Sequence, residues 1–132
     1  MPSLTADITQ TIKIGGDVVS KLVSYTGTGR TTVEILAAEL PDSTTDLEVN
    51  VNLDVSQIKA LYMVSTQALT VETNSASVPD DTIVLVANTA LVWWAGSYYT
   101  NLLATDVTAM FLTNASGSAA QFTLEVIHDA TP

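Results

Sequence analysis

The residue types that most often carry catalysis are scarce in this chain of 132 residues. There is no cysteine, and the single histidine, His128, follows a segment of alternating apolar and polar residues. A zinc site needs several imidazole or thiolate ligands, and an activated nucleophile needs a partner base that a third group orients. His128 has no second metal ligand and no Ser or Cys partner suggested by spacing. We therefore expect no enzyme activity and no cofactor.

Acidic pairs in polar segments are the second chemical candidates. Asp42 with Asp46, and Asp80 with Asp81, could supply the oxygen ligands that calcium favours. Neither pair has the spacing of a dedicated calcium loop, and aspartate is also a common turn former. Residues 27–30 (Gly-Thr-Gly-Arg) lack the third glycine of a dinucleotide fingerprint, and no Gly-Lys-Ser/Thr follows them. These features predict turns rather than metal or phosphate sites.

Four aromatic residues that are close in sequence form the best functional feature. They are Trp93, Trp94, Tyr98 and Tyr99. Neighbouring residues of a strand point to opposite faces, so if one tryptophan enters the core, the other faces solvent or a partner. Aromatic anchors concentrate binding energy at protein interfaces, and they also stack on sugar rings. All four are interface candidates; the alternative is that loops of the same chain cover both tryptophans.

The elements that must position these residues are β-strands. From Leu47 to Val55 every odd position is apolar and every even position is Glu, Asn or Asp, and this period of two recurs near both ends of the chain. Such alternation is typical of a strand with one buried and one solvated face. It predicts an all-β fold, an antiparallel β-sandwich that is jelly-roll-like and has about eight strands. We expect a single domain over residues 1–132, with flexible or arm-like ends at residues 1–3 and 130–132.

Four segments carry more specific expectations. Residues 58–65 and 82–87 are apolar at nearly every position, which predicts strands that are covered on both faces. Residues 54–57 predict a kink or one short turn. Residues 31–37 favour a strand because of their Thr and Val content, although residues 34–40 are also compatible with two helical turns.

The charge is strongly acidic and low in density. Fourteen acidic residues oppose four basic ones, and the formal net charge of −10 disfavours nucleic-acid binding, which needs clustered Lys and Arg. Charged residues make up only 14% of the chain and apolar residues 47%, a sparse surface charge for a solitary domain. Exposed sheet edges are usually guarded by Lys, and few lysines are present to do so. We therefore expect a homo-oligomer or a larger assembly.

Signals for export and membrane insertion are weak. Residues 1–4 contain neither the basic region nor the apolar core of a signal peptide, so we expect no secretion by that route. The longest apolar runs, residues 83–87 and 90–95, are far shorter than the ~20 residues of a membrane helix. We expect a protein that does not enter a membrane.

A short acidic all-β chain without cysteine, with few basic residues and with turns rich in Thr, Ser and Asn, resembles the small jelly-roll accessory proteins of tailed-phage virions. It is most similar in character to head decoration, or cement, proteins, especially over residues 54–74 and 91–129. The resemblance implies a structural virion protein that is made in the host cytoplasm and lies on the capsid surface. It would bind across neighbouring subunits of the major capsid protein, or another virion lattice protein, and stabilise the shell. The alternatives are a tail or baseplate subunit, or a carbohydrate-binding module that uses the four aromatic residues.

Overall fold

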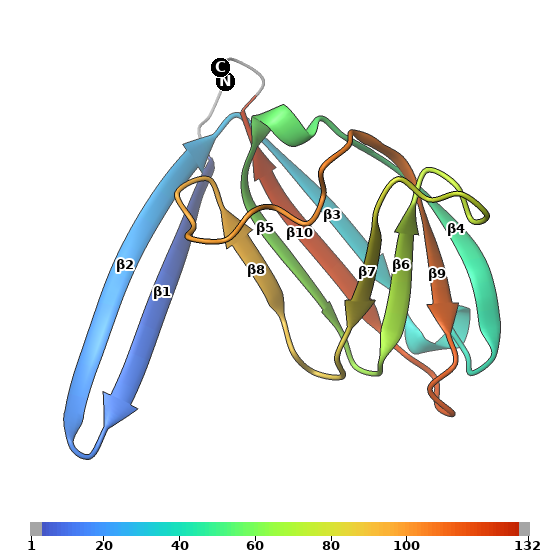
Figure 1. The fold of residues 1–132 in the computed structure, drawn as a ribbon, viewed down its shortest axis with the longest axis horizontal. Helices are drawn as coiled ribbons and strands as arrows, with labels where there is room; N and C mark the ends of the chain where they lie inside the picture. Colours follow the sequence, from blue (N-terminus) through green and yellow to red (C-terminus); the bar gives the residue numbers. More distant parts are fainter. Residues whose placement is uncertain (1–3, 130–132) are drawn as a thin grey trace.

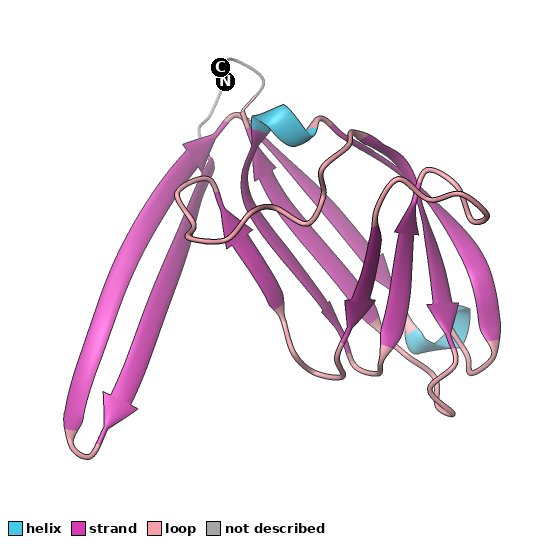
Figure 2. Ribbon diagram, in the orientation of Figure 1, coloured by secondary structure: helices cyan, strands magenta, loops and turns pink. Residues whose placement is uncertain are grey.

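The computed structural model describes residues 4–129, so the expectation about residues 1–3 and 130–132 lies outside the described residues. Within this range the protein is all-β, with ten strands and two short 3-10 turns, η1 (Ala37–Glu39) and η2 (Val55–Gln57) (Figure 2). The strands, in chain order, are β1 (Leu4–Ile14), β2 (Asp17–Gly27), β3 (Gly29–Ile35), β4 (Thr44–Leu53), β5 (Ile58–Ser65), β6 (Leu69–Thr73), β7 (Thr82–Leu85), β8 (Leu91–Trp94), β9 (Val107–Asn114) and β10 (Phe122–His128).

Eight of these strands form two four-stranded antiparallel sheets that pack together as a β-sandwich (Figure 1). One sheet has the order β3-β10-β5-β8, and the other has the order β4-β9-β6-β7. The pairs β3/β10, β4/β9, β5/β8 and β6/β7 are nested, as if one long hairpin had been rolled up. Eight strands paired in this nested way form a jelly roll, and the predicted fold class is confirmed.

The core lies between the two sheets and follows the alternation of the sequence. On β4, Val51 and Leu53 are buried, whereas Asn52 between them is exposed. In the opposite sheet, the central strand β10 buries every second residue: Phe122, Leu124 and Val126. Burying an apolar side chain of this size stabilises the fold by about 1.5–3 kcal/mol.

Two local predictions are confirmed in this sandwich. Residues 58–65 form β5, which lies between β10 and β8 in the interior of its sheet, as predicted. The expectation that both of its faces are covered is wrong, because Tyr62 is 41% exposed. Residues 54–57 form the short turn η2, in which Asp54 Oδ1 accepts a hydrogen bond of 3.0 Å from the backbone N–H of Ser56. A short polar side chain before such a turn satisfies an N–H that has no partner within the turn.

Two other predictions need correction. The strand expected over residues 31–37 ends at Ile35. Residues 34–40 do not form the alternative of two helical turns; they contain the single 3-10 turn η1, because Leu40 follows that turn directly into the core and is fully buried. The strand expected over residues 82–87 was to be covered on both faces. It is instead the edge strand β7, and Val84 is 68% exposed. In β7, therefore, apolar residues on both faces belong to an edge strand with one exposed face and do not indicate a central strand.

A long β-hairpin made of β1 and β2 stands apart from the sandwich. The two strands pair from Leu4↔Gly27 to Ile14↔Asp17 and form a separate two-stranded sheet. Gly15 in the turn has a φ of 65°, a conformation that glycine adopts without steric cost. The hairpin diverges from the sandwich, and its tip lies away from both sheets (Figure 1). We call residues 4–27 the arm.

The arm joins the sandwich at a close approach of two backbones. The N–H of Thr28 donates a hydrogen bond of 2.9 Å to the carbonyl oxygen of His128. A Cβ atom at Gly27 would lie 2.5 Å from that oxygen and 2.6 Å from Cγ2 of Ile127. The turn predicted at residues 27–30 is therefore a junction, where glycine lets the chain pass against the end of β10.

Candidate functional site

The two tryptophans of β8 lie on opposite faces of their sheet, as the alternation predicts. Trp93 packs against the core between the sheets and is half-buried. Trp94 is paired in register with Ala60 of β5 and is only 9% exposed. This chain covers Trp94 almost completely, so the ring on the outer face does not face solvent as expected, whereas Trp93 stays partly exposed.

The exposed aromatic residues are the tyrosines of the loop that follows β8. Tyr98 and Tyr99 are 94% and 74% exposed, and their ring centroids lie 5.4 Å apart with the planes at 87°. Trp93 is joined to this loop, since its Nε1–H donates a hydrogen bond of 2.8 Å to the carbonyl oxygen of Tyr99. The structure thus brings Trp93 together with the tyrosines and leaves Trp94 on the other face.

An apolar groove lies beside this loop, along the edge strand β8. It encloses about 510 Å³, and Val92 and Leu102 in its wall are 42% and 56% exposed. We call it the aromatic groove, and its lining residues are Leu91, Val92, Trp93, Tyr99, Thr100 and Leu102. None of these side chains is acidic or basic, so the groove suits an apolar or aromatic group.

A second pocket, of about 310 Å³, lies where the arm crosses the outer face of the β3-β10-β5-β8 sheet. Ile8 of the arm lines one side of it, and Tyr62 and Val92 line the other. Val92 also lines the aromatic groove, so the two hollows adjoin at this residue. Tyr62 and Val92 are paired across β5 and β8. Alternation alone marks them as outward-facing, but it does not show that they meet the arm.

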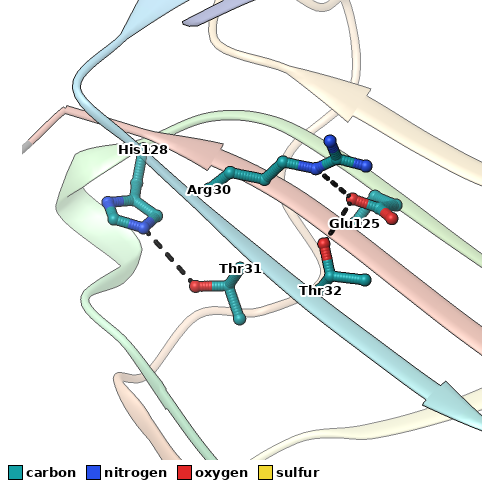
Figure 3. Close-up of polar contacts among 5 residues, drawn as sticks. All are labelled: Arg30, Thr31, Thr32, Glu125 and His128. Atoms are coloured by element: carbon teal, nitrogen blue, oxygen red, sulfur yellow. Dashed lines mark hydrogen bonds and ion pairs between the residues drawn. The ribbon is translucent and has the colours of Figure 1, made fainter. Parts of the chain in front are cut away.

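His128 lies near the junction, at the end of β10 (Figure 3). Its Nε2 is 3.4 Å from Oγ1 of Thr31. It lines a pocket of about 330 Å³ together with Asp54 and Asp106. Both carboxylates are engaged in loop structure: Asp54 caps η2, and Asp106 Oδ1 accepts a hydrogen bond of 3.0 Å from the backbone N–H of Val55. The lining of this pocket includes no serine or cysteine that could act as a nucleophile.

One ion pair joins β3 to β10 (Figure 3). Nε of Arg30 lies 2.8 Å from Oε2 of Glu125, and the same oxygen accepts a hydrogen bond of 2.9 Å from Oγ1 of Thr32. The hydrogen bond from Arg30 holds the pKa of Glu125 below its ordinary value; partial burial opposes this effect and Thr32 adds to it. Because these groups satisfy one another, the cluster stabilises strand pairing and offers no free acid or base.

The aspartates considered as calcium ligands are hydrogen-bonded within the fold: Asp46 and Asp80 accept from the side chains of Thr113 and Asn74, and Asp42 and Asp81 accept from backbone amides. Asp81 Oδ2 accepts from the N–H of Ala104 at 3.0 Å, and Asp42 Oδ1 accepts from the N–H of Gly117 at 2.8 Å. Over residues 4–129, no group of three or more His, Cys, Asp or Glu side chains could hold a metal ion. Nor does any helix of this range have the length and apolar character needed to cross a membrane.

The fold and its surface define a jelly-roll domain that bears a projecting arm and an apolar groove. Comparison with known proteins found no matching family model, no matching curated protein and no matching solved structure. The function is therefore inferred from the surface itself.

Proposed function

We propose that this protein is a structural virion subunit, a capsid decoration or cement protein of a tailed phage that binds across neighbouring capsid subunits and stabilises the shell. The observation that carries the proposal is the exposure of large apolar side chains on a surface with little charge. Tyr98, Tyr99 and Leu102 are 94%, 74% and 56% exposed, while only 14% of the chain is charged. Single exposed apolar residues are ordinary, but tyrosines gathered beside an apolar groove are typical of a docking surface.

The sheet edges support the same proposal. Strands β7 and β8 each lie at the edge of a sheet, and neither contains a charged residue. Edge strands of free monomers usually carry charges, because unpaired backbone groups otherwise attach to other chains. Subunits of a lattice have neighbours that cover such edges, so charged residues are not needed on these strands.

A cement subunit acts by binding alone and needs no turnover. Each copy adds a modest interface between adjacent capsid subunits, and the sum over the shell resists internal pressure. Truncating an aromatic anchor at an interface typically costs ~2 kcal/mol or more, so a few contacts at each copy are sufficient. The protein would lie on the outer capsid surface, after synthesis in the host cytoplasm.

The test is reconstitution with the capsid protein encoded in the same genome. Shells assembled from that capsid protein alone should take up the purified chain at a regular occupancy, and decorated shells should withstand a higher temperature than bare ones. Sedimentation of the mixture measures uptake, and electron microscopy locates the added density. A chain that stays in the supernatant with intact shells would refute the proposal, and antibody labelling on the tail instead of the head would favour a tail or baseplate subunit.

The aromatic groove favours one alternative, a carbohydrate-binding recognition module. Trp93 and Tyr99 line a hollow of about 510 Å³, which can admit a sugar ring. The geometry is less suited to a longer glycan, because the exposed rings of Tyr98 and Tyr99 are perpendicular, at 87°, and form no common platform. Retardation of the protein on an immobilised polysaccharide, abolished by Tyr99→Ala, would support this alternative over cement.

A further inference from the structure

We propose that the arm of one copy docks in the aromatic groove of a second copy, so that copies of this chain are joined by exchange of arms. The inference goes beyond the proposed function, because it concerns contacts between copies of this chain and requires no shell. Three observations carry it: an arm without sufficient support, a groove without an occupant in the same chain, and the distribution of charge.

The arm is too long to be supported by its own sandwich. Each strand has 11 residues and so reaches about 35 Å. The arm contacts β5 and β10 near its base, where Ala6 and Ile8 are half-buried. Farther along, Val18 and Leu22 are 58% and 61% exposed. An isolated two-stranded hairpin is marginally stable in water, so an arm of this length requires cover from another surface.

The aromatic groove is positioned to provide that cover for a second copy. Val92, Tyr99 and Leu102 give it an apolar lining without acidic or basic groups, which matches the exposed Val18 and Leu22 of the arm. Within one chain the outer part of the arm diverges from β8, the strand that borders the groove, and the arm and β8 lie at the same end of the sandwich (Figure 1). Each copy therefore presents an arm and a groove side by side, an arrangement that reciprocal exchange closes into a two-fold dimer.

The charge distribution selects a second copy as the occupant. The arm contains two of the four basic residues, Lys13 and Lys21, and two of the fourteen acidic residues, so it is formally neutral. The rest of the chain then carries the entire net charge of −10. Two sandwiches repel each other when they approach within a Debye length, about 10 Å at 0.1 M salt. A neutral arm that bears two lysines can approach an acidic sandwich without this repulsion.

The first experiment measures self-association of the purified chain by light scattering and sedimentation. The wild-type protein should have a mass of twice 13.9 kDa, as a two-fold dimer has. Val18→Asp with Leu22→Asp in the arm, and Leu102→Asp in the groove, should each weaken association by about tenfold or more. The control is Val78→Asp, which adds the same single charge as Leu102→Asp at a site 78% exposed in a different loop and should leave association unchanged.

The second experiment mixes the two defective variants. The arm variant keeps an intact groove and the groove variant keeps an intact arm, so the mixture should form a complex that contains both at concentrations where neither variant associates appreciably alone. A symmetric contact that does not involve arm exchange gives no such rescue. Circular dichroism and thermal unfolding verify the fold of each variant, and Leu22→Thr replaces the charged arm variant if that one does not fold.

Three results would overturn the inference: a wild-type chain that is monomeric at every concentration, arm or groove variants that associate like the wild type, and a mixture that forms no mixed complex. These results are separate from shell binding. A chain that exchanges arms but does not bind shells refutes cement alone, and a monomer that decorates shells refutes arm exchange alone.

Discussion

The indole Nε1–H of Trp93 donates a hydrogen bond of 2.8 Å to the carbonyl oxygen of Tyr99. This bond joins a side chain that packs against the core to a loop whose tyrosines are largely exposed. It therefore fixes the wall of the aromatic groove, and the loop presents Tyr98 and Tyr99 to solvent from a defined position.

We predict that Trp93→Phe loosens the loop more than it destabilises the fold. The change keeps an aromatic ring against the core and removes the N–H, which contributes about 0.5–1.5 kcal/mol as a typical hydrogen bond. Amide hydrogen exchange over residues 95–101 should accelerate relative to the wild type. Trp94→Phe, a change of the same size on the other face, is the matched control. Equal exchange rates in wild type and Trp93→Phe would show that the bond does not hold the loop.

We predict that Asn114→Ala lowers the free energy of unfolding by about 2 kcal/mol or more, because buried acceptors lose their donor. Asn114 is fully buried, and its Nδ2 donates to the carbonyl oxygens of Leu40 at 3.0 Å and Ser118 at 2.8 Å. Denaturant unfolding measures the loss. Asn50→Ala, on the exposed face of β4, should change stability by no more than about 0.5 kcal/mol. Equal effects of the two changes would contradict the role assigned to Asn114.

The burial of Asn114 also affects how a sequence motif is interpreted, because residues 114–116 fit the sequon for N-glycosylation. The amide of Asn114 is fully buried and used in the fold. We therefore read the sequon match as accidental.

We predict that the stability difference between wild type and Glu125→Gln disappears in acid. Arg30 lowers the pKa of Glu125 in the folded state, so the ionised carboxylate stabilises the fold at pH values above its unfolded pKa of about 4.3. That stabilisation is lost as the pH falls through the lower folded pKa. Urea unfolding of both proteins between pH 7 and pH 2.5 tests this. A difference that widens as the pH falls would mean that the sign is wrong.

We predict that Gly27→Ala destabilises the junction between the arm and the sandwich by about 1–3 kcal/mol, the usual cost of an overpacked site. The added Cβ would lie 2.5 Å from the carbonyl oxygen of His128, so the backbone has to shift. Gly16→Ala is the control, because a Cβ there meets no atom within 4 Å. Thermal unfolding should separate the two variants clearly; if they melt together, the close approach at Gly27 is not a constraint on the fold.

The sequence predicted the jelly roll because its pattern is local. Alternation over residues 47–55 and the turn signals between strands depend on neighbouring residues alone, and the corresponding elements lie where expected. The central position of β5 was also predictable, since its residues are apolar on both faces. The same argument failed for β7, because apolar residues on two faces indicate that both faces need cover and do not show which chain provides it.

The candidate site was predicted only in part, since its surface joins distant segments. The cluster of Trp93, Tyr98 and Tyr99 is adjacent in sequence and was found. The burial of Trp94, and the contribution of Tyr62, depend on how β5, β8 and the arm are arranged in space. Periodicity shows that β1 has two faces, but it does not show that β1 and β2 leave the sandwich as an arm.

The position of β10 determines the order in which the molecule can fold. β10 lies between β3 and β5, and Arg30 and Glu125, which it brings together, are 95 residues apart in sequence. During synthesis the arm can close as soon as it emerges, whereas β3 and β5 have no strand between them until β10 is made. Folds dominated by such distant pairings form on the order of milliseconds to seconds. During that interval the unpaired edges of β3 and β5 are open to other chains, so the time of greatest risk for aggregation comes just before the last strand is inserted.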